Sequence, residues 1–256
     1  MGKVMEKVYR PEPFFIEFAK TYLHGDILKK DCDTQSSPTI LFLHGMSQSA
    51  DRNSFHLLRQ SLLHHYDVSS CAFDYVGHGG TGGEWEGDSL QRRTEQTLDV
   101  IDACFDCQAL TIVAVGVSAY VALKLLSLAP VENLILIRPL VPFPELYKLS
   151  FRNLLAEQAL CLPRSLESTD IFEPLQSFEG GMGLVVAEQD ERVPQSLVKQ
   201  WRQGAVFTRE QCCLTIPGRS FALQALVHTQ PLLLMEIARM IARLCAVSNE
   251  LVAVDA

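Results

Sequence analysis

The chain has 256 residues and a formal net charge of −8 at neutral pH, with 48% apolar and 20% charged residues. This length suffices for one large domain with its own core, and the composition excludes a disordered or low-complexity chain. The acidic balance gives no electrostatic reason to bind nucleic acid or an anionic membrane, so neither partner is expected.

The chain shows no sequence pattern typical of secretion, membrane insertion or a disulfide framework. The N-terminal segment lacks the apolar stretch of a signal peptide, and the apolar run at 232–244 is interrupted by charged residues, so a cytoplasmic protein without membrane spans is expected. The eight cysteines are expected to be mostly reduced core residues. Cys104 and Cys107 form a CxxC, but no second ligand pair accompanies them, so neither a metal nor a cofactor is expected.

Apolar strand-like runs alternate with helical patterns along most of the chain. The expected strands lie at 14–18, 21–28, 39–43, 68–73, 110–115, 133–137, 184–187 and 213–216. The expected helices lie at 54–65, 89–105, 120–128, 194–202 and 232–244. This alternation predicts parallel βαβ units, and therefore an α/β fold with a mostly parallel, doubly wound sheet and helices on both faces.

One longer segment interrupts this alternation after Ile137. It contains several prolines, short helical pieces and aromatic residues. Insertions of this length inside a regular alternation are usually lids or functional excursions. We therefore predict a small helical cap at 139–180 within a single domain that covers 1–256. The cap residues Phe143, Tyr147 and Phe151 are expected either to line an apolar pocket or to pack in the core.

Three motifs suggest a relationship to a known family. They are LFLHGM at 41–46, FDYVGHGGTG at 73–82 and AVGVSAY at 114–120. In the last of these, an apolar run leads to Ser118 among small residues and a helical run follows, as in a nucleophile elbow. In this order and spacing the motifs resemble those of the α/β-hydrolase superfamily, and the resemblance covers nearly the whole chain. It implies the α/β-hydrolase fold with a small helical cap.

The resemblance also implies roles for residues around the elbow. Ser118 would be the nucleophile, and the backbone N–H groups of Met46 and Ala119 would form the oxyanion hole. His44 would shape the loop and line the pocket. The glycine-rich loop at 77–82 has neither the spacing nor the lysine of a phosphate-binding loop, so it is expected to be a connecting turn.

The catalytic acid is expected after a late strand. Asp190 lies in the sequence LVVAEQDERVP and matches the acid position of the superfamily, where it would orient a histidine. The alternative is that Asp190 caps the helix that begins near Pro194.

The base histidine is missing from its expected place. Ser220 occupies the histidine slot in the sequence LTIPGRSF, and a serine hydroxyl cannot replace imidazole as a base near neutral pH. His228 lies eight residues later and would reach Ser118 only if the loop takes a different path. Tyr120 stands where the elbow motif has its final glycine, either as a pocket-lining phenol or as a core aromatic.

These features predict a serine hydrolase that acts on a small carboxylic ester or thioester through Ser118, with an atypical or impaired triad and weak activity. The alternative is a catalytically inactive or non-hydrolytic homologue with a binding or regulatory role. A third hypothesis is different chemistry in the same pocket. In each case the partner is a small molecule, and the sequence does not predict the oligomeric state.

Overall fold

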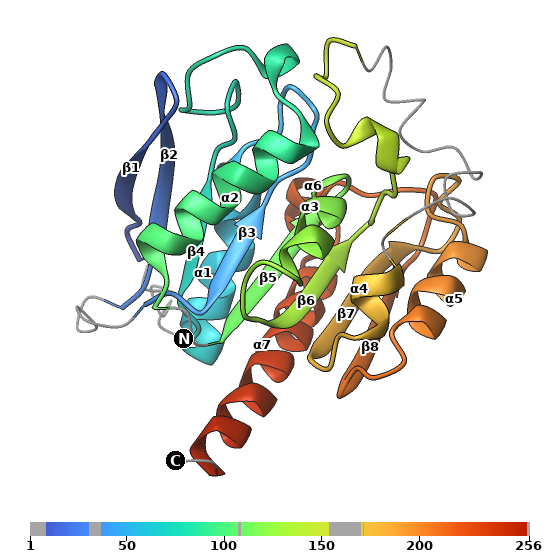
Figure 1. The fold of residues 1–256 in the computed structure, drawn as a ribbon. Coiled ribbons are helices and arrows are strands. Elements are labelled where there is room, and N and C mark those ends of the chain that lie inside the picture. Colours follow the sequence, from blue (N-terminus) through green and yellow to red (C-terminus); the bar gives the residue numbers. More distant parts are fainter. Residues whose placement is uncertain (1–8, 31–36, 107–108, 154–169, 171, 255–256) are drawn as a thin grey trace.

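The computed structural model describes residues 9–30, 37–106, 109–153, 170 and 172–254. These residues form an eight-stranded sheet in the order β1-β2-β4-β3-β5-β6-β7-β8 (Figure 1). The strands are β1 (Glu12–Phe18), β2 (Thr21–Leu28), β3 (Ile40–Leu43), β4 (Ser70–Phe73), β5 (Leu110–Val115), β6 (Val131–Ile137), β7 (Gly181–Ala187) and β8 (Glu210–Ile216).

The sheet is parallel from β4 to β8, and only β1 and β2 pair antiparallel at one edge. The central parallel strands are buried on both faces, and every residue of β3, β4 and β7 is buried, whereas the edge strand β8 is partly exposed. Continuous apolar runs are typical of such strands. This confirms the predicted mostly parallel, doubly wound sheet.

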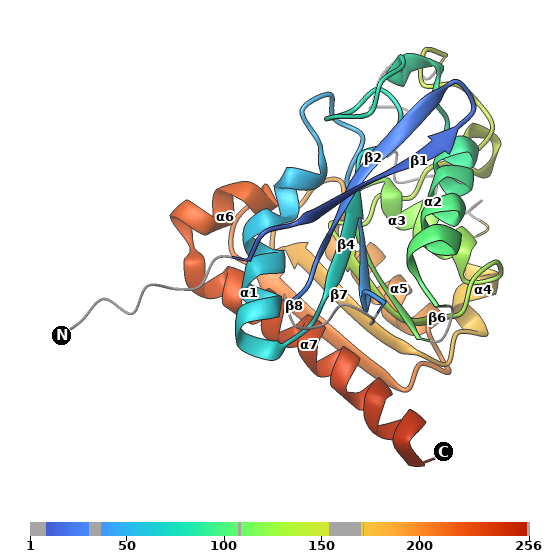
Figure 2. The same ribbon diagram turned by 90° about the vertical axis from the view of Figure 1, so that its left-hand side faces the viewer.

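Helices cover both faces of the sheet (Figure 2). The face with α2 and α3 also carries the short α4 and α5, and the opposite face carries α1, α6 and α7. The helices are α1 (His56–Tyr66), α2 (Leu90–Cys104), α3 (Ser118–Leu125), α4 (Phe172–Gln176), α5 (Gln195–Gly204), α6 (Leu223–Thr229) and α7 (Pro231–Val254). Each helical layer closes its own buried apolar core against the sheet.

Two local differences from the sequence-based expectation matter for the site. Helix α3 begins at Ser118, two residues before the expected start at 120. Helix α6 is not among the expected helices, and it begins at Leu223, after a loop at 217–222 that contains the predicted base slot Ser220. The short α6 carries few periodic apolar positions, so its helical pattern is weak in the sequence.

The glycine-rich loop at 77–82 is built around the buried carboxylate of Asp74. Gly80 N–H donates to Asp74 Oδ2 at 2.8 Å, and the Thr81 hydroxyl donates to the Asp74 carbonyl oxygen at 2.6 Å. Gly79 has φ +48°, and a Cβ there would lie 2.2 Å from Asp74 Oδ2. Arg52 pairs with the same carboxylate. In the structure this loop joins β4 to α2.

Part of the predicted cap, at 154–169 and 171, lies outside the described residues, as does Cys107 of the CxxC. The cap at 139–180 therefore stays a prediction. The described part of that segment contains a 3₁₀-helical turn at Pro144–Leu146 and helix α4. No helix in the described ranges combines the length and the apolar character needed to cross a membrane.

Candidate functional site at the carboxyl ends of the strands

The carboxyl ends of the central strands open onto a cavity of about 310 Å³. The residues that line it follow β3, β5, β6, β7 and β8, as expected for ligand sites in open α/β sheets. They are His44, Gly45, Met46, Ser47, Ser49, Ala50, Ser54, Phe55, Val115, Gly116, Val117, Ile137, Arg138, Leu140, Arg192, Phe221, Ala222, Leu223 and Gln224. Of the four predicted pocket residues, only His44 belongs to this set.

The sharp turn between β5 and α3 is centred on Gly116. This residue has φ +62°, in the left-handed region that side chains other than glycine adopt only with strain. A Cβ placed on Gly116 would lie 3.9 Å from Leu140 Cδ1, with no closer neighbour. Gly116 also lines the cavity. The position that a nucleophile elbow presents to its pocket is therefore held by a glycine with open space in front of it.

Ser118 lies on the buried side of this turn. It is the first residue of α3, its exposed fraction is 0%, and its Oγ donates to the His44 carbonyl oxygen at 2.5 Å. It is not among the residues that line the cavity. Ser118 was expected at the elbow turn, but the left-handed residue of that turn is Gly116, two positions earlier in the chain.

The sequence itself indicates that the elbow motif is centred on Gly116. The elbow pattern places small residues two positions before and two positions after the nucleophile. Around Gly116 these positions are Ala114 and Ser118, so the pattern is complete with Gly116 at its centre. Tyr120 then falls outside the motif, and it no longer replaces a required glycine.

Tyr120 is a core aromatic with a polar end. Its exposed fraction is 1%, and its hydroxyl donates to Asp170 Oδ1 at 2.6 Å. The Lys124 ammonium pairs with the same carboxylate. The Tyr147 ring packs 5.9 Å from the Tyr120 ring, and Tyr147 and Phe143 are half-buried away from the cavity lining. Of the two interpretations of Tyr120, the geometry favours core packing over a pocket-lining phenol.

The backbone after β3 is oriented by hydrogen bonds to Gly45. The Gly45 carbonyl oxygen accepts from His44 Nδ1 at 2.8 Å and from Arg93 Nη1 at 3.2 Å. Because C=O and N–H point in opposite directions across a trans peptide, the Met46 N–H is directed away from Arg93. Met46 lines the cavity, which fits the expected role of its N–H as an anion donor.

The second expected donor, the N–H of Ala119, is used within the turn. It donates to the Gly116 carbonyl oxygen at 3.2 Å, and Leu140 N–H donates to the same oxygen at 3.0 Å. The Val117 N–H points the opposite way from this carbonyl, and Val117 lines the cavity. The geometry therefore favours Val117 over Ala119 as the partner of Met46.

His44 is held in one neutral tautomer. Its Nε2 accepts from the Tyr75 N–H at 3.1 Å, and its Nδ1 donates to Gly45. Burial, followed by the positive charge of Arg93, holds the pKa of His44 well below its usual range. Both ring nitrogens are occupied and the ring does not protonate near neutral pH, so His44 shapes the loop and is not a base.

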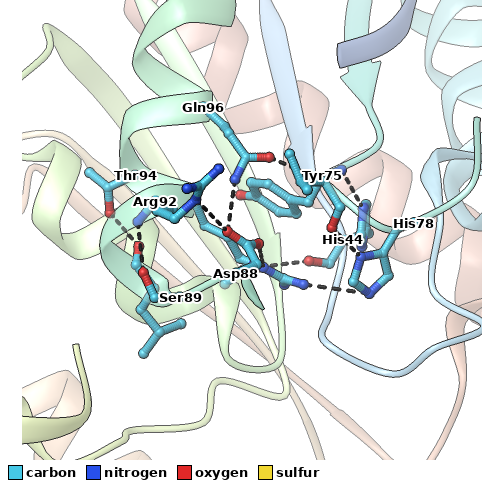
Figure 3. Close-up of polar contacts among 12 residues, drawn as sticks. His44, Tyr75, His78, Asp88, Ser89, Arg92, Thr94 and Gln96 are labelled. Carbon is cyan, nitrogen blue, oxygen red and sulfur yellow. Dashed lines mark hydrogen bonds and ion pairs between the residues drawn. The ribbon is translucent and has the colours of Figure 1, made fainter. Parts of the chain in front are cut away.

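A buried ion pair supports the underside of this loop. Arg93 Nε donates to Asp88 Oδ2 at 3.2 Å, and both side chains are completely buried. Gln96 Nε2 donates to Asp88 Oδ1 at 3.0 Å. Arg93 also lies over the Tyr75 ring, 4.5 Å from its centroid, and donates to His78 at 3.5 Å. Figure 3 shows Asp88, Gln96, Tyr75 and His78 gathered next to His44 in one group of polar contacts.

Acidification should destabilise the fold through His44. The pKa of this ring is lower in the folded chain than in the unfolded chain, so its contribution is present above the ordinary value near pH 6.5 and is lost as the pH falls below it. From about pH 7.5 to about pH 5.5, the loss from His44 alone should be on the order of 1 kcal/mol. The pKa of His78 is also lowered by burial, so it acts in the same direction.

Urea unfolding of the wild type and His44→Asn at both pH values measures this effect. The variant should show the smaller pH-dependent loss, whatever its baseline stability. His65→Asn, which changes an exposed histidine on α1, should keep the wild-type dependence. Equal pH dependence in the wild type and His44→Asn would contradict the assignment.

Asp190 is buried after β7, and its carboxylate is engaged by an arginine. Arg138 Nε donates to Asp190 Oδ2 at 2.6 Å, and the Arg192 N–H donates to Asp190 Oδ1 at 3.0 Å. Helix α5 has Pro194 as its N-cap and no side-chain cap bond, so Asp190 does not cap that helix. In the loop after β7 the Asp190 carboxylate is paired with Arg138, and its role as catalytic acid stays a prediction.

The predicted base slot lies outside the cavity. Ser220 is exposed, and the cavity is lined by Phe221 instead. The Phe221 carbonyl oxygen accepts from Arg138 Nη1 at 3.3 Å, and the Phe221 ring centroid lies 5.9 Å from the Arg138 guanidinium carbon. His228 lies on α6, and its side chain is outside the described part of the chain. Its predicted approach to Ser118 stays a prediction.

Within the described ranges, no group of three or more His, Cys, Asp or Glu side chains could hold a metal ion. The arrangement offers two backbone N–H groups, two arginines and apolar walls around an open glycine turn. Such groups can receive a negative charge, but the described lining contains neither an accessible nucleophile at the elbow nor a free imidazole.

Comparison with known proteins identifies the fold. No family model matches the sequence, and no curated protein matches it. Solved structures match over most of the chain. An esterase from Pyrococcus furiosus has a TM-score of 0.60 at 14% identity, with 92% of this chain and 90% of that chain covered. The thioesterase domain from the curacin biosynthetic pathway has a TM-score of 0.65 at 16% identity, with 93% and 99% covered.

A serine hydrolase involved in carbazole degradation is similar at a TM-score of 0.63 and 15% identity, with 92% of this chain and 100% of that chain covered. These neighbours are α/β-hydrolase enzymes. Together with the sheet order and the helices on both faces, they show that this chain has the α/β-hydrolase fold, as the three sequence motifs predict.

Proposed function

We propose that this protein uses an α/β-hydrolase fold to bind a small molecule without hydrolysing it through a serine acyl-enzyme. One observation carries the proposal. The elbow position that faces the cavity is Gly116 at φ +62°, whereas Ser118 is buried and its Oγ is bonded to the His44 carbonyl oxygen. A nucleophile must reach the substrate carbonyl, but Ser118 is buried, and among the described residues no imidazole nitrogen is hydrogen-bonded to its Oγ.

The other two triad positions support the same proposal. A catalytic acid acts by orienting a histidine, but Asp190 is bonded to Arg138. The Ser220 side chain is exposed and lies outside the cavity lining. The cavity itself is retained, with the size and apolar walls of a small-molecule site. Binding is therefore the function that these residues still support.

Labelling with a fluorophosphonate probe tests this proposal against the serine hydrolase alternative. Wild-type protein and Ser118→Ala should both show no labelling above a heat-denatured sample. Ser54→Ala serves as a matched control, because Ser54 does line the cavity. Peptide mapping identifies any modified residue. An adduct on Ser118 that disappears in Ser118→Ala would overturn the proposal and restore the ester or thioester hydrolase.

A further inference from the structure

The charge of the cavity differs in sign from that of the protein. The chain carries 30 acidic residues and a net charge of −8, yet no Asp or Glu in the described part of the chain lines the cavity. Its charged lining residues are Arg138 and Arg192, while His44 is neutral for the reasons given above. A positive site on an acidic protein focuses field lines on anions and raises their local concentration.

The two arginines are not equivalent. Arg138 is neutralised by Asp190, and its Nε and one Nη1 donor are used by Asp190 and Phe221. Arg192 reaches the cavity from the β7–α5 loop with an exposed side chain, and no ion pair to its guanidinium occurs among the described residues. The uncompensated positive charge of the cavity is therefore that of Arg192.

The backbone at the elbow adds N–H groups, which also favour a negatively charged ligand. The Met46 N–H points away from the Gly45 carbonyl oxygen, which accepts from Arg93. The Val117 N–H likewise points away from the Gly116 carbonyl oxygen, which accepts from the N–H groups of Ala119 and Leu140. Met46 and Val117 both line the cavity. Backbone N–H groups and a guanidinium that line the same cavity can together receive an anion with two acceptor oxygens.

The remaining walls are apolar. Phe55, Val115, Ile137, Leu140 and Phe221 contribute them, and a cavity of about 310 Å³ admits one compact organic molecule. We infer that the ligand is a small carboxylic acid with an apolar body, whose carboxylate is received by Arg192 and the elbow N–H groups. The inference rests on the proposed binding function, and it names the class of ligand.

Binding of matched acids and amides tests the inference. Phenylacetate, hexanoate and 3-phenylpropionate are each compared with the corresponding amide by isothermal titration calorimetry near neutral pH. The acids should bind the wild-type protein at least about tenfold more tightly than their amides, because the charge-assisted hydrogen bonds are lost in the amide. Amides that bind as well as the acids, or a panel in which no acid binds, would overturn the inference.

Two arginine variants locate the effect. Arg192→Gln should weaken binding of the acids about tenfold and leave that of the amides unchanged. Arg202→Gln, which changes an exposed arginine on α5 outside the cavity lining, should change neither. If Arg192→Gln binds the acids as tightly as Arg202→Gln, the assigned anion site is wrong. Failure of the binding function itself would appear separately, as an adduct on Ser118 in the fluorophosphonate experiment.

Discussion

Replacing Arg93 by leucine should lower the free energy of unfolding by about 3–5 kcal/mol, the usual effect of removing one partner from a buried ion pair. The change leaves the completely buried Asp88 without the guanidinium that now lies 3.2 Å away. Burial already raises the pKa of Asp88, even with Arg93 beside it. The Gly45 carbonyl oxygen also loses a donor. Urea unfolding near neutral pH measures the loss.

The neighbouring arginine provides the matched control. Arg92 also faces Asp88, but at 3.7 Å and with 43% of its side chain exposed, so Arg92→Leu should cost less than about 1 kcal/mol. The double variant Asp88→Asn/Arg93→Leu should recover part of the stability, because no unpaired charge remains. Equal losses in Arg92→Leu and Arg93→Leu would contradict the proposed role of the buried pair.

Replacing Arg138 by leucine should have the second largest effect, a loss of about 2–4 kcal/mol in the free energy of unfolding. The Asp190 side chain is only 2% exposed and loses its counter-ion at 2.6 Å, while the 27% exposure of Arg138 places the expected loss below that of a fully buried pair. Thermal and urea unfolding measure it. Arg219→Leu, at an exposed arginine that follows β8, should be nearly neutral.

A double-mutant cycle shows whether Arg138 acts through Asp190. Asp190→Asn combined with Arg138→Leu should be more stable than Arg138→Leu alone, because the uncompensated carboxylate is gone. If the two changes add without interaction, Asp190 does not depend on Arg138. That result would free the carboxylate for the orienting role that the triad hypothesis assigns to it.

The backbone of Arg138 is strained, because this residue lies in the left-handed region. It has φ +47°, which is uncommon for a residue with a side chain and costs about 1–3 kcal/mol. Such backbone persists only where surrounding contacts determine it, and here the contacts are those with Asp190 and Phe221. Arg138 is thus held beside Asp190 by the hydrogen bonds of its side chain, in a backbone conformation that those bonds help to maintain.

The fold could be predicted from the sequence because its signals are local and repeated. Mostly apolar strands such as β3 and β5 alternate with amphipathic helices, and this pattern decides the sheet class without any long-range information. The three motifs added the family resemblance. The position of the cavity at the strand ends follows from the same topology.

The site was predicted only in part, because its decisive features depend on single backbone angles and long-range pairs. The serine in AVGVSAY draws attention to position 118, while the left-handed turn that places Gly116 at the cavity is visible only in the backbone. Similarly, Arg138 follows β6 and Asp190 follows β7, and nothing in either local sequence links the two side chains. The adjacent strands bring them together.

Cysteine placement tests the central claim most directly. Under native conditions, Gly116→Cys and Ser118→Cys are treated with iodoacetamide, and the modified peptides are followed by mass spectrometry, so that the natural cysteines serve as internal references. Gly116→Cys should react at least about 100-fold faster, since a thiol at 118 would be buried and would react only after local opening. Equally fast reaction at position 118 would place Ser118 in the cavity and contradict the account.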